Sequence, residues 1–111
     1  NDLNHNMIDQ YAFYKKNSGF QTNDVGQKKP NLWGIYDMSG NVWEWCSDWK
    51  GDYPTEKITD PAGASSGSFR VVRGGSWLSL PRDCRSANRN DYSPDDRNSN
   101  VGFRLVLLPA Q

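Results

Sequence analysis

The most reactive side chains of this 111-residue chain are two cysteines, Cys46 and Cys84, and a single histidine, His5. The cysteines are too far apart in sequence for the CxxC pair of a zinc knuckle, and one histidine cannot complete a Cys and His zinc site. Ser79 and Ser93 are candidate nucleophiles with His5 as their base, but no spacing in the chain supports a catalytic triad. These residues therefore indicate neither a zinc site nor a hydrolase.

The composition narrows the class of protein that must position these residues. Apolar residues make up 35% of the chain, mean hydropathy is −0.88, and aromatic residues reach 13% with five tryptophans. Buried aromatic anchors argue against disorder, and ten glycines argue against a helical bundle. Thirteen basic and thirteen acidic residues cancel without forming a basic stripe, so no nucleic-acid partner is expected. Apolar runs are too short for a membrane span.

The chain has the length of one domain or of one piece of a larger domain. It begins Asn-Asp-Leu without an initiator Met or a signal peptide, so an interior or processed segment is expected. Periodicity and turn residues predict loops joining a few short elements. The expected elements are a helix over 6–17 with Asn6 as its N-cap, strands over 42–46 and 69–73, a long surface excursion over 50–68, and, as the clearest strand, 102–108.

Five sequence blocks resemble the formylglycine-generating-enzyme, or sulfatase-modifying-factor, family in their order and approximate spacing. They are GIYDMSGNVWEWCSDW (34–49), RVVRGGSW (70–77), CRSANR (84–89), Pro94 and GFRLV (102–106). The resemblance covers about residues 7–108 and corresponds to the C-terminal half of the family's domain. It implies an α+β fold, a variant of the C-type lectin fold with little regular structure. Residues 1–111 would then be the C-terminal part of a single domain whose N-terminal remainder is an expected partner.

Within these blocks, aromatic, glycine and arginine residues are expected to serve the scaffold. Gly74 and Gly75 are expected to permit a backbone geometry that a Cβ would forbid. Side chains of two further kinds are expected to be structural. The tryptophans Trp33, Trp43, Trp45, Trp49 and Trp77 are expected to pack in and around the core, and Arg85, Arg89 and Arg104 to pair with Asp37, Glu44 or Asp48.

The resemblance implies an oxidase site that this chain does not complete. The family oxidises a substrate cysteine with copper(I), which is held by two thiolates in the stretch after GGS-aromatic. Counted from Trp77, Cys84 matches one of these thiolates and Ser79 stands at the other position; counted back from Gly102, both positions are empty. Soft copper(I) requires thiolates, which a serine hydroxyl cannot replace. No catalytic residue is therefore expected, and a formylglycine-generating oxidase is kept as the alternative function.

The resemblance also implies a calcium site and a relation between the two cysteines. Asn41 and Glu44 match positions that supply calcium with side-chain oxygens in the family. Alternatively, Asn41 adopts a left-handed turn and Glu44 pairs with an arginine. Cys46 and Cys84 are expected to lie close together, either as a disulfide or as two buried thiols. No cofactor is expected to be required for function, and calcium is the one candidate.

Residues 78–100 carry a second pattern, in which fixed-looking residues alternate with short clusters. Every clustered residue is one that adenine changes can produce from an AAC or AAT codon, whereas Lys, Glu, Gln, Met and Trp cannot be produced in this way. The pattern resembles the variable proteins of diversity-generating retroelements, although polar loops are commonly rich in Asn, Asp and Ser. The candidate ligand-binding residues are Leu78, Ser79, Leu80, Asp83, Asn90, Asp91, Tyr92, Ser93, Asp96, Asn98, Ser99 and Asn100.

The resulting hypothesis is a non-enzymatic ligand-binding domain with a diversified surface, with a purely structural accessory domain as a further alternative. Tyrosine and leucine would supply contact area, and Ser, Asn and Asp adaptable hydrogen bonds. The clustered residues are expected to share one solvent-facing surface, because Trp77, Arg85, Ala87 and Phe103 are expected to point inward. The expected ligand is a macromolecule, a protein in the first place, and the expected location is the cell or phage surface.

Overall fold

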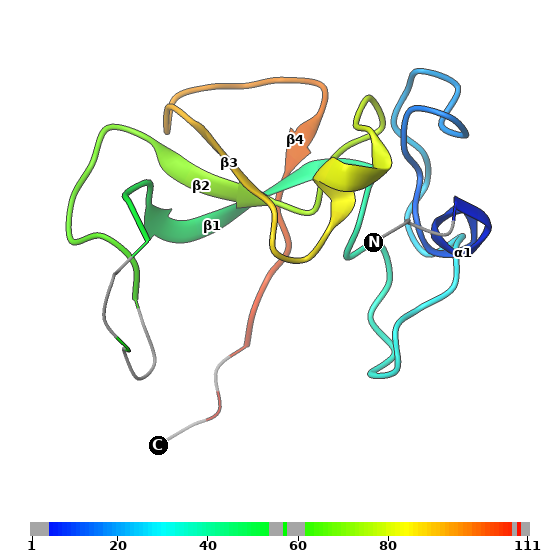
Figure 1. Cartoon of the computed structure of the whole chain (residues 1–111), viewed down its shortest axis with the longest axis horizontal. Coiled ribbons are helices and arrows are strands. Elements are labelled where there is room, and N and C mark those ends of the chain that lie inside the picture. Colours follow the sequence, from blue (N-terminus) through cyan, green and yellow to red (C-terminus); the bar gives the residue numbers. More distant parts are fainter. Residues whose placement is uncertain (1–4, 54–56, 58–61, 108, 110–111) are drawn as a thin grey trace.

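A computed structural model describes residues 5–53, 57, 62–107 and 109. Short regular elements are joined by long loops (Figure 1). They are helix α1 (His5–Tyr11), strand β1 (Trp43–Trp49), strand β2 (Arg70–Arg73), the 3₁₀ helix η1 (Pro81–Cys84), strand β3 (Arg89–Tyr92) and strand β4 (Val101–Gly102). The chain is thus an α+β fragment with one short α-helix and little regular structure. In its described part, no helix is long and apolar enough to cross a membrane.

One curled sheet of four strands organises the molecule, in the order β3-β2-β1-β4 (Figure 1). Strand β2 pairs antiparallel with both β1 and β3, and β4 pairs in parallel with the start of β1. The β1–β2 register is interrupted between Trp45 and Trp49, where the sheet bends. Helix α1 and the loops that follow it lie beside one end of this sheet.

The core lies where the central strands meet the loop after α1. Val71 and Val72 are consecutive on β2 and both fully buried, so this strand is covered on both faces. Tyr14, from the loop after α1, is also buried, and its hydroxyl donates a hydrogen bond to Asp9. Burial raises the pKa of Tyr14 to about 12. Hydrogen bonds from the Lys15 amide to the Ser79 carbonyl and from the Asn41 amide to the Phe13 carbonyl fasten this loop to later segments of the chain.

The predicted helix is correct in place and wrong in extent, because α1 ends at Tyr11. Beyond it, Asn17 accepts a hydrogen bond from the Tyr14 amide and donates one to the Ala12 carbonyl, so the asparagine side chain takes over groups that a continuing helix would use. Asn6 is also not an N-cap, since it lies within the helix, which already includes His5.

The strand predicted over 102–108 is wrong for most of its length, because β4 contains only Val101 and Gly102. Residues 103–107 find no partner strand in the described part of the chain, and β propensity without a partner does not produce a strand. Conversely, β3 forms from the polar sequence RNDY, which has no apolar alternation to reveal it. Pairing with β2 makes this segment a strand.

The tryptophans differ widely in burial. Trp43 is 5% exposed on the central strand β1, as expected of a core residue. Trp45, Trp49 and Trp77 are half-buried. Trp33 is 86% exposed in a turn whose backbone amide is held by the Asn31 side chain, so its predicted core position is wrong.

Candidate functional site

The turn that precedes β1 is held by two other loops. Gly40 donates its amide hydrogen bond to the Gly74 carbonyl at 2.6 Å, and Asn41 donates to the Phe13 carbonyl at 2.7 Å. Both residues have positive φ, and a Cβ on Gly40 would collide with the Phe13 carbonyl. Asn41 in turn accepts a hydrogen bond from the Trp77 amide on its carbonyl, at 2.7 Å. The turn is therefore a rigid junction between the sheet and the loops.

The two glycines of the RGGSW block are needed for close packing, as expected. Gly74 and Gly75 have φ of 97° and 76°, a region that other residues rarely adopt. A Cβ on Gly75 would lie 2.7 Å from the Cys84 sulfur. The block therefore brings β2 directly against η1.

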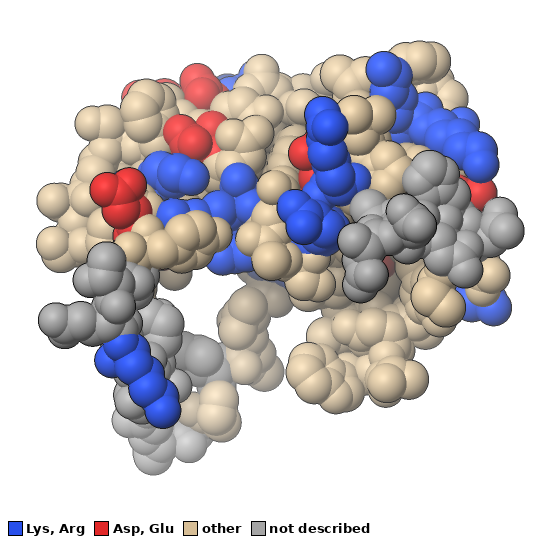
Figure 2. Space-filling model, viewed as in Figure 1, with Lys and Arg blue, Asp and Glu red and all other residues tan. Residues whose placement is uncertain are grey.

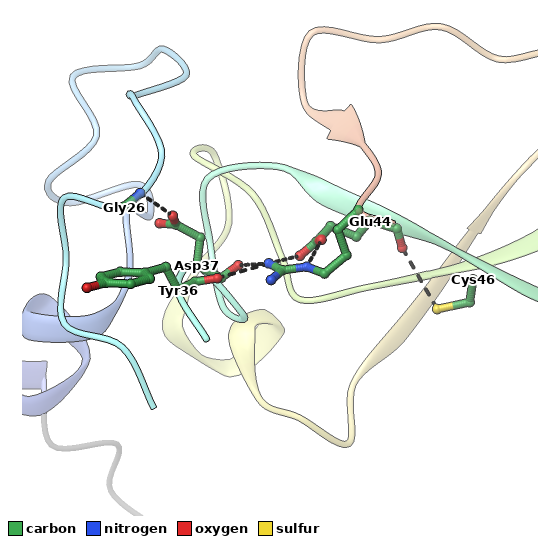
Figure 3. Close-up of polar contacts among 6 residues, drawn as sticks. Gly26, Tyr36, Asp37, Glu44 and Cys46 are labelled. Carbon is green, nitrogen blue, oxygen red and sulfur yellow. Dashed lines mark hydrogen bonds and ion pairs between the residues drawn. The ribbon is translucent and has the colours of Figure 1, made fainter. Parts of the chain in front are cut away.

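An arginine–carboxylate network joins Arg104, which follows β4, to β1 (Figure 3). Arg104 pairs with both carboxylate oxygens of Glu44, and its Nη2 donates to the backbone carbonyls of Tyr36 and Asp37 at 3.0 Å. Hydrogen bonding to Glu44 raises the pKa of Arg104, because it favours the charged guanidinium. Asp37 turns to the other side and accepts a hydrogen bond from the Gly26 amide at 2.9 Å. The network holds three separate loops together.

The side chains matched to a calcium site are engaged with protein groups. Asn41 accepts a hydrogen bond from the Asn23 amide at 2.9 Å and donates one to the Asn23 carbonyl at 3.0 Å. Arg104 occupies the carboxylate of Glu44, so a divalent cation there would face a guanidinium. In the described residues, no group of three or more His, Cys, Asp or Glu side chains could hold a metal. These contacts match the alternative expectation, a left-handed Asn41 and an arginine-paired Glu44, and calcium at this turn stays a prediction.

The two cysteines are both free thiols, so the structure contains no bond between them. Cys84 is buried at the end of η1, and burial raises its pKa to about 11. Cys46 is half-buried on β1, where its sulfur lies 3.9 Å from the Glu44 carbonyl, and burial also raises its pKa. Both sulfurs therefore hold their protons at neutral pH, which disfavours thiolate chemistry at either position.

Ser79 does not belong to an exposed surface, in contrast to the prediction. It is 7% exposed, and its hydroxyl accepts a hydrogen bond from the Ser76 amide at 2.8 Å. Its carbonyl accepts one from the Lys15 amide at 2.9 Å. The hydroxyl closes the tight turn 76–79, and such local side-chain bonds to the backbone draw serine inward.

Among the other clustered residues, two groups lie at opposite edges of the sheet, and Asp83 lies on η1. Residues 90–92 lie on β3, at one edge, whereas 98–100 lead into β4, at the other. The segment between them arches from one edge to the other (Figure 1). The group around 98–100 is joined to the RGGSW block, because the Trp77 indole donates to the Ser99 carbonyl at 3.2 Å. Leu78 and Leu80, which follow Trp77 in sequence, are exposed.

Strand pairing also separates the members of the β3 group. Asn90 pairs with Val72, and Asp91 with Val71, so these neighbours point to opposite faces of the sheet. Tyr92 shares the face of Asn90, where its ring meets Trp45 edge-to-face at 6.2 Å. The expectation of one common solvent-facing surface is therefore wrong for this strand.

The residues expected to point inward beneath this surface do so only in part. Trp77 is half-buried, whereas Arg85, Ala87 and Phe103 are exposed. The expected ion pairs are also limited, since Arg104 has its carboxylate partner but Arg85 donates from Nε to the Arg82 carbonyl. Alternation was inferred for segments that form turns, so it could not assign their faces.

The sequence did not predict a cluster formed by Arg73, Arg89 and Tyr53. Arg73 and Arg89 are directly opposite each other across β2 and β3, and the Arg89 guanidinium lies 3.8 Å from the centre of the Tyr53 ring. The signal was absent because Arg89 belongs to an unrecognised strand and Tyr53 to a distant loop. On the face shown in Figure 2, basic and acidic side chains are interspersed and uncharged residues cover most of the surface.

The fold and these contacts define a loop-rich α+β domain built around a tryptophan-bearing strand and an arginine–glutamate network. Comparison with known proteins assigns it: the chain belongs to the family described as Sulfatase-modifying factor enzyme 1-like domain, which matches residues 2–108. The resemblance inferred from the sequence blocks is thereby confirmed.

Individual relatives differ in their described roles. The structure of Treponema denticola variable protein 1 is 45% identical, with a TM-score of 0.83, over 88% of this chain and 36% of that one. The serine/threonine-protein kinase pkn1 of Chlamydia pneumoniae is 43% identical over 77% of this chain and 14% of its own length. The formylglycine-generating enzyme of Streptomyces coelicolor is 42% identical over 77% of this chain and 29% of its own. The chain thus spans between 14% and 36% of these relatives.

Proposed function

We propose that this chain is a non-enzymatic ligand-binding protein whose segment 78–100 is diversified by a retroelement, and that it is displayed at a cell or phage surface. The observation that carries this proposal is the similarity to a protein described as a variable protein, at 45% identity and a TM-score of 0.83. The clustered residues that adenine changes can produce from AAC or AAT codons support it independently. Leu78 and Leu80 add exposed apolar groups, which suit a contact surface.

The way in which the diversified segment is fastened supports tolerance to substitution. Its carbonyl groups accept the long-range hydrogen bonds: Ser79 from the Lys15 amide, Ser99 from the Trp77 indole, and Asn100 from the Trp43 amide at 2.7 Å. A carbonyl is present whatever side chain the codon specifies. The side chains of Ser99 and Asn100 can therefore change while these hydrogen bonds remain, whereas Ser79 also holds its turn through its hydroxyl.

The alternative function is a formylglycine-generating oxidase, and the similarity to the Streptomyces coelicolor enzyme favours it. This activity would require two thiolates to hold copper. Here Ser79 offers a buried hydroxyl already used in a turn, and Cys84 a thiol whose pKa is raised to about 11. We expect no aldehyde when the full-length protein is incubated with copper and a Cys-x-Pro-x-Arg peptide. Aldehyde formation that Ser79→Ala preserves and Cys84→Ala abolishes would establish the oxidase instead.

The diversification itself is tested by sequencing the 3′ end of the gene from many cells of one population. We expect substitutions at the clustered positions, each produced by adenine changes from an AAC or AAT template copy beside a reverse-transcriptase gene. The codons of Trp43 and Trp77 serve as internal controls and should be invariant. An absence of variation at the clustered positions, or variation spread evenly over the gene, would favour the structural accessory domain.

The remainder of the family domain is the proposed polypeptide partner. Leu105, Val106 and Leu107 are 88%, 79% and 96% exposed, so three successive apolar side chains are not covered by the described residues. Beside them, the buried Asp37 leaves its Oδ1 without a hydrogen-bond partner, in a pocket of about 490 Å³ whose lining includes Phe103. Relatives are much longer than this chain and have polypeptide to cover such a surface.

Cysteine accessibility tests this partner. A Val106→Cys variant should react with a maleimide in the isolated 111 residues and be protected in the complete gene product. Asn98→Cys, on the diversified loop, is the matched control and should react in both. Equal labelling of Val106→Cys in the two proteins would contradict the proposal.

A further inference from the structure

A row of charged side chains crosses three strands on one face of the sheet. Glu44 on β1 is opposite Arg73 on β2, and Arg73 is opposite Arg89 on β3. Arg104 occupies both carboxylate oxygens of Glu44, so Glu44 does not serve as the counter-ion of this row. Arg73 and Arg89 are thus like charges that neighbour each other across β2 and β3, and an anion bound between them would offset their repulsion.

The hydrogen bonds of the two arginines leave most of their donors available. Arg73 donates from Nη1 to the Ser86 carbonyl at 3.0 Å, and Arg89 donates from Nη2 to the Gly51 carbonyl at 2.6 Å. Ion pairs within the described part of the chain involve other residues, and the buried Nε of Arg89 has no partner. A guanidinium carries five N–H donors, so both arginines can still bind an oxyanion.

Both arginines line a cavity of about 510 Å³ at the end of β1. This volume lies in the range of small-molecule sites and also suits one or two residues of a peptide. Trp49 and Tyr53 provide aromatic walls, and stacking on the Tyr53 ring orients the Arg89 guanidinium. Asp48 and Asp52 line the same cavity. The site therefore offers donors for one anionic group and acceptors nearby.

We propose that Arg73 and Arg89 bind a carboxylate group of an amino-acid or peptide ligand. A planar carboxylate matches the guanidinium fork, and its single charge is better tolerated beside Asp48 and Asp52 than the second charge of a phosphate. An ammonium or amide N–H of the same ligand can donate to these aspartates. None of the clustered residues is among the described residues that line the cavity, and Asp91, two positions from Arg89 on β3, is the clustered residue on the same face of the sheet.

The test is an NMR titration of the full-length protein that follows the Arg89 Nε–H signal. Two probes carry the expected group: acetate is a free carboxylate, and glycylglycine is a peptide with a terminal carboxylate. Glycylglycinamide is the matched peptide without the carboxylate. Inorganic phosphate tests whether another class of anion binds, and sodium chloride controls for ionic strength. We expect saturable shifts with acetate or glycylglycine and none with the amide or chloride. A response to acetate alone identifies a small carboxylate, and tighter binding of glycylglycine identifies a peptide terminus.

Variants decide whether the two arginines act together. Arg73→Gln should weaken carboxylate binding about tenfold or more, because charge-assisted hydrogen bonds are lost. Arg97→Gln, an exposed arginine outside the cavity, is the matched control and should bind like the wild type. Arg89→Lys keeps the charge but not the fork, and thermal unfolding of each variant confirms that it is folded. Binding unaffected by Arg73→Gln, phosphate binding as tight as carboxylate binding, or no saturable shift would overturn the proposal.

Discussion

Cys84 should react unusually slowly with a disulfide reagent in the folded chain. Its sulfur lies under the backbone of Gly75, and the side chain is almost completely buried. Burial raises its pKa from 9.0 to about 11, so the thiolate fraction at pH 8 falls from about one in ten to about one in a thousand. A thiolate of higher pKa is intrinsically more nucleophilic, which restores about tenfold of this loss. Ionisation alone therefore predicts a rate about tenfold lower, and restricted access lowers it further.

The assay measures the reaction of the aromatic disulfide DTNB with two variants that each keep one cysteine, Cys46→Ser for Cys84 and Cys84→Ser for Cys46. Each is compared folded and unfolded in denaturant. The half-buried Cys46 should react faster than Cys84 in the folded state, and both should react alike when unfolded. The Cys84 rate should also continue to rise above pH 9. Equal folded and unfolded rates for Cys84 would refute the reasoning, and thiols that appear only after reduction of the wild type would reveal a disulfide.

Three further predictions concern stability. Trp43→Ala should lower the free energy of unfolding by about 3–5 kcal/mol in denaturant titrations, whereas the exposed Trp33→Ala should change it by less than about 0.5 kcal/mol. Gly75→Ala should cost more than Gly26→Ala: both residues have φ near 75°, but only the Gly75 Cβ would meet another atom, and the strain alone is about 1 kcal/mol. Stability measured against pH should fall between about pH 9 and 11, since the folded state holds the Cys84 proton through a range in which the unfolded state loses it.

The sequence predicted those elements whose apolar alternation is strong and whose partner strands are present. Strands β1 and β2 were predicted to within a few residues, because tryptophans alternate with other residues at the start of β1, and the two β-branched valines of β2 are followed by Gly74 and Gly75. Strand β3 could not be predicted, since its residues are polar and only pairing with β2 orders them. The strand predicted over 102–108 was too long for the opposite reason. Its residues favour β structure, but beyond Gly102 they have no partner strand in the described part of the chain.

For the candidate site, too, some properties followed from the sequence and others only from the tertiary structure. Motif order by itself determined the family, and residue types place one cysteine, Cys84, in the stretch after RGGSW. Burial and partnership were decided by the tertiary structure: Ser79 turns inward to close its own turn, and Arg104 reaches back to Glu44 across most of the sequence. Arg73 and Arg89 become neighbours only through the register of β2 and β3. Residue type specifies what a side chain can do, but long-range hydrogen bonding and strand pairing decide what it meets.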